Sequence, residues 1–121
     1  MSLTFVNRQF KDTKNDLLLF QAKEKCVLSD YIVYDKTYNE SGDESNIFPH
    51  MYRFPDITLE KGEYVALRLH KGNTNKGATK QNEVCYNVFW GIDDKASIFN
   101  DDGDVVHLVR IAEETSNPII G

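Results

Sequence analysis

The residues best suited to bind a ligand are acidic and lie near the end of the chain. Asp93 and Asp94, together with residues 100–104, bring carboxylate and amide oxygens close together in sequence. Oxygen donors of this kind suit calcium, although the twelve-residue loop with a terminal Glu that defines an EF-hand is missing. Asp and Asn side chains also accept hydrogen bonds from their own backbone in turns. A solvated turn is therefore the preferred interpretation, and Asp102 and Asp104 are kept as weak calcium candidates.

A second candidate, residues 72–79, has two glycines spaced as in a phosphate-binding loop. Its second glycine, Gly77, is followed by Ala78, where such a loop has the lysine that reaches the phosphates. The segment also leads into a predicted strand, so no helix N-terminus would face an anion. We interpret residues 72–79 as a flexible loop.

Nucleophilic or metal chemistry would have to use two cysteines and three histidines. Cys26 and Cys85 lack the paired short spacing of a zinc or redox motif and are expected to be half-buried thiols, with a single bridge between them left open. His50, His70 and His107 are far apart in sequence and are expected at exposed strand positions. His107 could activate the Cys85 thiol as a nucleophile only if the two side chains shared a cleft. No catalytic residue, no metal ligand set and no cofactor is assigned.

The elements that position these residues are predicted to be strands. In residues 63–70, Val65, Leu67 and Leu69 alternate with more polar side chains, which is the pattern of a half-buried strand. No window has helical periodicity for long enough to predict a helix. Further strands are predicted over residues 3–10, 16–22, 31–38, 84–90 and 104–111, with a short apolar stretch over 47–54, and turn signals at 61–62, 71–77 and 102–103. Short strands separated by turns are typical of a sandwich or barrel.

Size and composition indicate one globular domain over residues 1–121. The chain is 40% hydrophobic and 27% charged, and its net charge of −5 disfavours binding to nucleic acid. No apolar run approaches the ~20 residues that span a bilayer, so no membrane span is expected. Residues 1–3 are compatible with an expression remnant, residues 113–121 are expected to fray, and the localisation stays open.

Several short motifs occur in an order and spacing that resemble the lamin-tail domain. They are Tyr52-Arg-Phe54-Pro55, Leu59-Glu-Lys-Gly62-Glu-Tyr-Val65, Phe89-Trp90-Gly91, and Ile98-Phe-Asn100-Asp-Asp-Gly103-Asp104 followed by Val106 and Leu108. The chain differs from the family where Ser29-Asp30-Tyr31 stands in place of Ser-Gly-Trp and where Lys61 replaces a frequent proline. The resemblance implies an all-β, immunoglobulin-like antiparallel β-sandwich.

The physical interpretation of these motif residues is structural. Gly62 and Gly103 stand at chain reversals that need positive φ. Phe54 and Leu59 flank Pro55 as an apolar lead into the next strand, and Trp90 ends a strand with a large buried ring. None of these residues supplies catalytic groups.

The resemblance implies a non-catalytic interaction or anchoring module, and not an enzyme. We expect a protein partner, bound through edge strands or through the loops at residues 39–46 and 72–77, on a monomer or weak oligomer. Lys71, Lys76 and Lys80 form the one sequence-local basic cluster, which is too small for us to expect nucleic-acid binding. The rival hypothesis is a hydrolase or a calcium-dependent carbohydrate-binding domain on a sandwich, because a fold does not fix a function.

Overall fold

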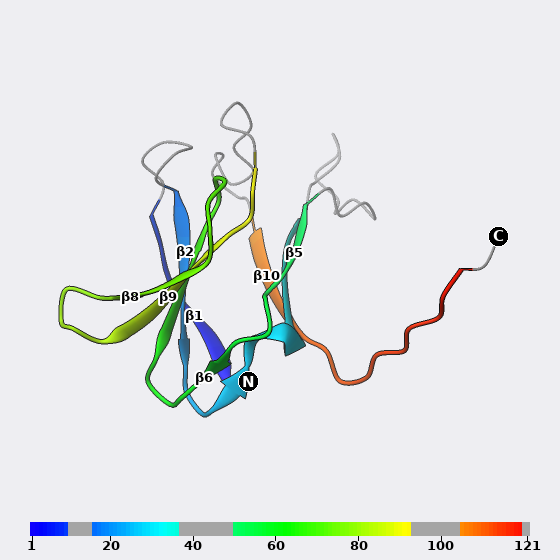
Figure 1. Ribbon diagram of the computed structural model, residues 1–121, viewed down its shortest axis with the longest axis horizontal. Helices are drawn as coiled ribbons and strands as arrows, with labels where there is room; N and C mark the ends of the chain where they lie inside the picture. Colours follow the sequence, from blue (N-terminus) through cyan, green and yellow to red (C-terminus); the bar gives the residue numbers. More distant parts are fainter. Residues whose placement is uncertain (10–15, 37–49, 93–104, 120–121) are drawn as a thin grey trace.

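The protein is built from strands that form two facing layers (Figure 1). The computed structural model describes residues 1–9, 16–36, 50–92 and 105–119. Within these ranges the elements are β1 (Leu3–Gln9), β2 (Leu17–Ala22), β3 (Cys26–Val27), the 3-10 turn η1 (Leu28–Asp30), β4 (Tyr31–Lys36), β5 (Met51–Arg53), β6 (Thr58–Leu59), β7 (Tyr64–Arg68), β8 (Asn75–Ala78), β9 (Val84–Phe89) and β10 (Val105–Arg110).

One layer is a five-stranded sheet with the order β1-β2-β7-β9-β8. The other is a three-stranded sheet with the order β10-β4-β5, and Figure 1 shows it beside the first layer. The short pair β3-β6 makes a third, two-stranded sheet. The predicted all-β sandwich is therefore confirmed.

The core lies between the layers because the strands alternate apolar and polar side chains. Val65, Leu67 and Leu69 are buried as the alternation of residues 63–70 predicts, and Val88 of β9 lies with them in one apolar cluster. Ala66, predicted on the other face, is also buried, so β7 is covered on both faces at its centre. The cluster continues through Leu18 and Phe20 of β2 and through Tyr31 and Val33 of β4. Each such side chain contributes roughly 1.5–3 kcal/mol when it is removed from water.

Strand pairing differs from the sequence prediction in one respect. All described pairs are antiparallel except β7-β9, which is parallel, with Tyr64 opposite Cys85 and Arg68 opposite Phe89. The chain leaves β7, forms the edge strand β8, and returns as β9 between the two. Gly72 lies against the ring of Phe89 on this path, so a side chain at Gly72 would force the ring to move.

Three strands were not predicted. β8 occupies part of the segment interpreted as a flexible loop, and that interpretation is wrong from Asn75 onward. β3 and β6 are two residues each, and their pairing joins Cys26 to Leu59.

In the described part of the chain no helix is long and apolar enough to cross a membrane.

The turn before β7 confirms the role predicted for Gly62. Its φ is +90°, a value that L side chains rarely adopt, and its N–H donates to the carbonyl of Ala22 at 2.8 Å. Gly91, at the end of β9, has a φ of +83°. The matching prediction for Gly103 lies outside the described residues, as do Asn100, Asp102 and Asp104.

Candidate binding surfaces

Apart from β3 and β6, which are two residues each, four strands have a backbone edge that no other described strand covers. They are β1 and β8 in the five-stranded sheet, and β10 and β5 in the three-stranded sheet. Edge strands of this kind can accept an added strand from a partner. Of the two loops predicted for recognition, residues 39–46 lie outside the described residues, and residues 72–77 run into β8.

The β8 edge is polar and is tied to its sheet by side-chain hydrogen bonds. Asn87 Nδ2 donates to Asn75 Oδ1 at 2.9 Å, and Arg68 Nε donates to Asn87 Oδ1 at 3.1 Å. This polar ladder therefore joins three neighbouring strands, β7, β9 and β8. On the other face Lys76 Nζ lies 5.7 Å from the ring centre of Tyr86. β8 itself has no large exposed apolar side chain of the kind that anchors most partners.

The β1 edge points backbone hydrogen-bonding groups outward. Ala22 donates to Glu63 and accepts from Gly62, so its backbone faces β7 and not β1. Leu3 lies opposite Ala22, and in an antiparallel pair of this type the N–H and C=O of Leu3 must then face away from β2. Alternation gives Phe5, opposite Phe20, the same orientation. Leu3 and Phe5 thus present their N–H and C=O groups at the open edge.

Two apolar side chains are exposed beside these backbone groups. Phe5 and Val6 are 47% and 46% exposed, and the ring of Phe5 meets Phe20 edge-on with 5.6 Å between ring centres. The register of β1 shifts between Phe5 and Asn7, so Val6 is the extra residue of a β-bulge. The sequence signal for this site is the adjacent pair Phe5-Val6, which breaks the alternation expected of a half-buried strand.

A cavity of about 380 Å³ opens at the end of the sandwich where β3 and β6 pair. Its lining includes the buried side chains of Cys26 and Tyr31 and three charged side chains from Lys25, Asp30 and Arg110. Nothing in the sequence predicted this cavity, because its residues come from five separate segments. Its size falls in the range of small-molecule sites.

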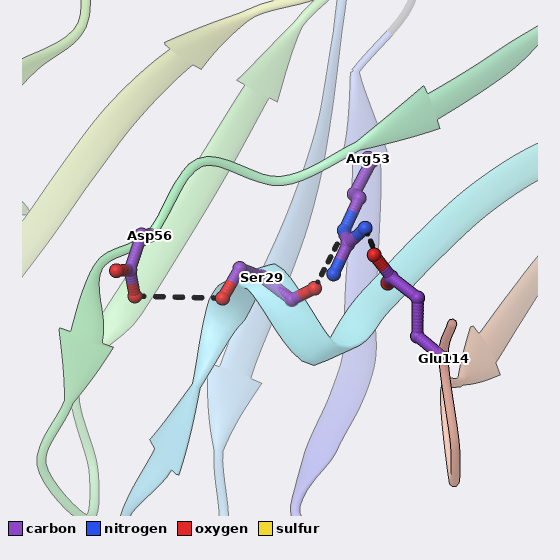
Figure 2. Close-up of polar contacts among 4 residues, drawn as sticks. All are labelled: Ser29, Arg53, Asp56 and Glu114. Atoms are coloured by element: carbon purple, nitrogen blue, oxygen red, sulfur yellow. Dashed lines mark hydrogen bonds and ion pairs between the residues drawn. The ribbon is translucent and has the colours of Figure 1, made fainter. Parts of the chain in front are cut away.

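A polar network holds the chain next to this cavity (Figure 2). Ser29 Oγ donates to Asp56 Oδ1 at 3.4 Å, and Arg53 Nε donates to the carbonyl of Ser29 at 2.8 Å. Arg53 also pairs with Glu114 at 2.6 Å. The network therefore fastens η1, β5 and the start of the C-terminal segment to one another. Beyond Glu114 the segment runs away from the sandwich in Figure 1.

Both cysteines are free and more buried than predicted, at 8% exposure each. Burial raises the pKa of the Cys26 thiol, and the nearby charge of Asp30 raises it further. Burial also raises the pKa of Cys85, against a smaller opposing effect of Arg68. Both side chains are therefore thiols at neutral pH, and a thiol is a much weaker nucleophile than a thiolate.

The histidines lie on separate elements and are half-buried, not exposed. His107 of β10 stacks on Tyr34 with 4.8 Å between ring centres, while Cys85 lies on β9 of the other sheet. The structure therefore does not bring Cys85 and His107 together. His70, after β7, contacts Phe89, and His50 precedes β5. No group of three or more His, Cys, Asp or Glu that could hold a metal ion occurs among the described residues.

The described motif residues are packing residues. Phe54 and Leu59 are buried in the core, and Tyr52 packs edge-on against Phe54 with 5.4 Å between ring centres. Trp90 is half-buried and lies 5.7 Å from the ring centre of Tyr52, so it covers the core and is less buried than predicted. Pro55 accepts a hydrogen bond from the N–H of Ile57 and shapes the turn into β6.

The basic cluster lies in and around β8, and its three side chains are all exposed: Lys71, Lys76 and Lys80.

Comparison with protein-family models, with curated proteins and with solved structures finds no match to this chain.

Proposed function

We propose that this domain is a non-catalytic interaction module of the lamin-tail type, which binds an extended segment of a protein partner at the edge of β1. The observation that carries the proposal is the coincidence of outward-facing backbone groups at Leu3 and Phe5 with the exposed side chains of Phe5 and Val6. Backbone hydrogen bonds would supply affinity, and the two apolar side chains would select the partner's sequence.

The β1 edge is a better candidate than the other open edges. β8 exposes Lys76 and Asn75, and the side-chain oxygen of Asn75 already accepts a hydrogen bond from Asn87 within the domain. β5 is only three residues long. β10 has one large apolar side chain that is clearly exposed, Val109 at 39%. β1 has the longest open edge and two such side chains.

The charge distribution supports an acidic partner segment. Residues 1–25, which include β1 and β2, hold five basic and three acidic side chains. The whole chain holds fourteen basic and nineteen acidic side chains, so residues 26–121 hold nine and sixteen. Residues 1–25 therefore carry +2 against −7 for the rest of the chain. Opposite charge on a partner speeds encounter and selects the correct surface.

A displayed library of random extended peptides tests the proposal. We expect selection on the immobilised domain to enrich peptides with alternating apolar residues and with carboxylates. Their binding should fall at least tenfold in Phe5→Lys and in Val6→Lys, because both substitutions place a charge on the contact surface while the backbone stays intact.

Val109→Lys is the matched control, since Val109 is also an exposed apolar residue on an edge strand. It should bind the selected peptides as the unsubstituted domain does. Circular dichroism and thermal midpoints establish that all three variants are folded. Enriched peptides that bind Phe5→Lys and Val6→Lys normally would place the binding site elsewhere and contradict the proposal.

A further inference from the structure

The cavity at the end of the sandwich combines buried walls with a charged rim. Arg110 ends β10 and lies opposite Tyr31, so its side chain leaves the sheet on the same face as the buried Tyr31 ring. Asp30 ends η1, and its carbonyl accepts a hydrogen bond from Ile111 at 2.6 Å. The arginine and the aspartate therefore come from neighbouring chain segments and line one cavity.

These two charges are not neutralised within the described part of the chain. Neither the guanidinium of Arg110 nor the carboxylate of Asp30 has a hydrogen bond or an ion pair there, and they do not pair with each other. The third charge, Lys25, lies 3.7 Å from Glu60 and is compensated. Among the described residues, the cavity thus has one cation and one anion without a partner, beside an apolar wall that includes Val27.

We propose that this cavity binds a small zwitterion, an amino acid with a carboxylate, a protonated amine and an apolar side chain. The carboxylate pairs with Arg110, whose planar guanidinium suits it, and the amine pairs with Asp30. The apolar side chain lies against Val27 and Tyr31. A ligand with only one of the two charges leaves the other rim charge unpaired and binds less tightly.

The two cysteines give an internal reporter for this test. Cys26 and Cys85 are equally exposed, but Cys26 lines the cavity and Cys85 lies on β9, away from it. A ligand in the cavity should slow modification of Cys26 alone. Methyl methanethiosulfonate is a suitable reagent because it reacts with thiols and not with the amine of the ligand, and mass spectrometry of the digested protein gives both rates in one sample.

L-Leucine is the probe, with N-acetyl-L-leucine and L-leucinamide as analogues that keep one charge each. We expect L-leucine to slow modification of Cys26 severalfold and saturably, with Cys85 unchanged, and we expect each analogue to protect several times less at equal concentration. The ratio of rates with and without ligand is compared, because removing Asp30 also changes the basal reactivity of Cys26.

Arg110→Gln and Asp30→Asn should abolish the protection, whereas Lys61→Gln, at an exposed position that does not line the cavity, should retain it. Three results would overturn the proposal: equal or no protection of the two thiols, protection by N-acetyl-L-leucine or L-leucinamide as strong as by L-leucine, or protection that survives in either rim variant. Thermal midpoints of the variants separate a lost site from a lost fold.

Discussion

At the scale of single residues, the backbone conformation of Gly62 alone determines which residues this position tolerates. Its φ is +90°, and a Cβ built there would meet no atom within 4 Å. Gly62→Ala should therefore cost about 1–2 kcal/mol through backbone strain, without any steric clash. Urea denaturation measures this cost, with the neighbouring exposed variant Lys61→Ala as control. Equal unfolding free energies for the two variants would show that the turn tolerates a side chain.

The hydroxyl of the half-buried Tyr52 links burial to stability at alkaline pH. Burial raises the pKa of Tyr52 from 10.0 to about 12. The unfolded chain therefore releases this proton at a lower pH than the folded chain, so its contribution to stability is full below pH 10 and is lost as the pH rises to about 12. Tyr52→Phe should lose less stability than the unsubstituted protein between those values in urea denaturation. Parallel pH profiles for the two proteins would contradict this assignment.

The sequence-based predictions succeeded for residues whose burial follows alternation and failed for those fixed by distant contacts. Val65, Leu67 and Leu69 were placed correctly because neighbours in the strand alone set the pattern. The depth of Cys85 could not be predicted, since it depends on which strands flank β9. Likewise, Asp30 and Arg110 meet at one cavity only because β10 pairs with β4.

At the scale of elements, the strands with strong alternation were predictable, and the weakly patterned ones were not. β8 is an example, because Asn75–Ala78 contains no apolar alternation and is held by its pairing with β9. β3 and β6 are too short to leave a periodic signal. The parallel pairing of β7 and β9 is a property of strand order, which the sequence does not encode locally. For the same reason β1 was predicted as a strand but not as the open edge.

The polar ladder across β7, β9 and β8 should stabilise the β8 edge. Asn87 both accepts from Arg68 and donates to Asn75, so Asn87→Ala removes two hydrogen bonds. We expect Asn87→Ala to lower the free energy of unfolding by about 1 kcal/mol. Amide exchange should become faster than in the unsubstituted protein, and more so in β8 than in β7. Asn73→Ala is the control, because the described contact of Asn73 uses its backbone carbonyl and not its side chain. Unchanged exchange in the Asn87 variant would show that backbone pairing alone holds β8.

At the scale of the whole molecule, two layers of strands around one core predict a far-ultraviolet circular dichroism spectrum dominated by strand. Thermal unfolding followed by this signal should coincide with unfolding followed by the fluorescence of Trp90, because Trp90 packs on the same core that joins the layers. Two separated transitions would show that the layers unfold independently.

The uneven charge of the molecule and its open edge lead to one expectation about partners. Residues 1–25, which contain β1 and β2, are the basic part of an acidic chain, so an acidic extended segment should be drawn to the edge that has outward backbone groups. Salt should weaken this binding but not abolish it, since backbone hydrogen bonds and apolar contacts remain.

Amide hydrogen exchange of Leu3 and Phe5, measured by NMR with and without a selected peptide, tests the proposed strand addition most directly. In the free protein these two amides should exchange rapidly, while Thr4, which alternation turns toward β2, should be protected. Bound peptide should protect Leu3 and Phe5 and leave Lys76 on β8 unchanged. Leu3 and Phe5 amides that remain unprotected in a saturated complex would contradict the assignment of β1 as the binding edge.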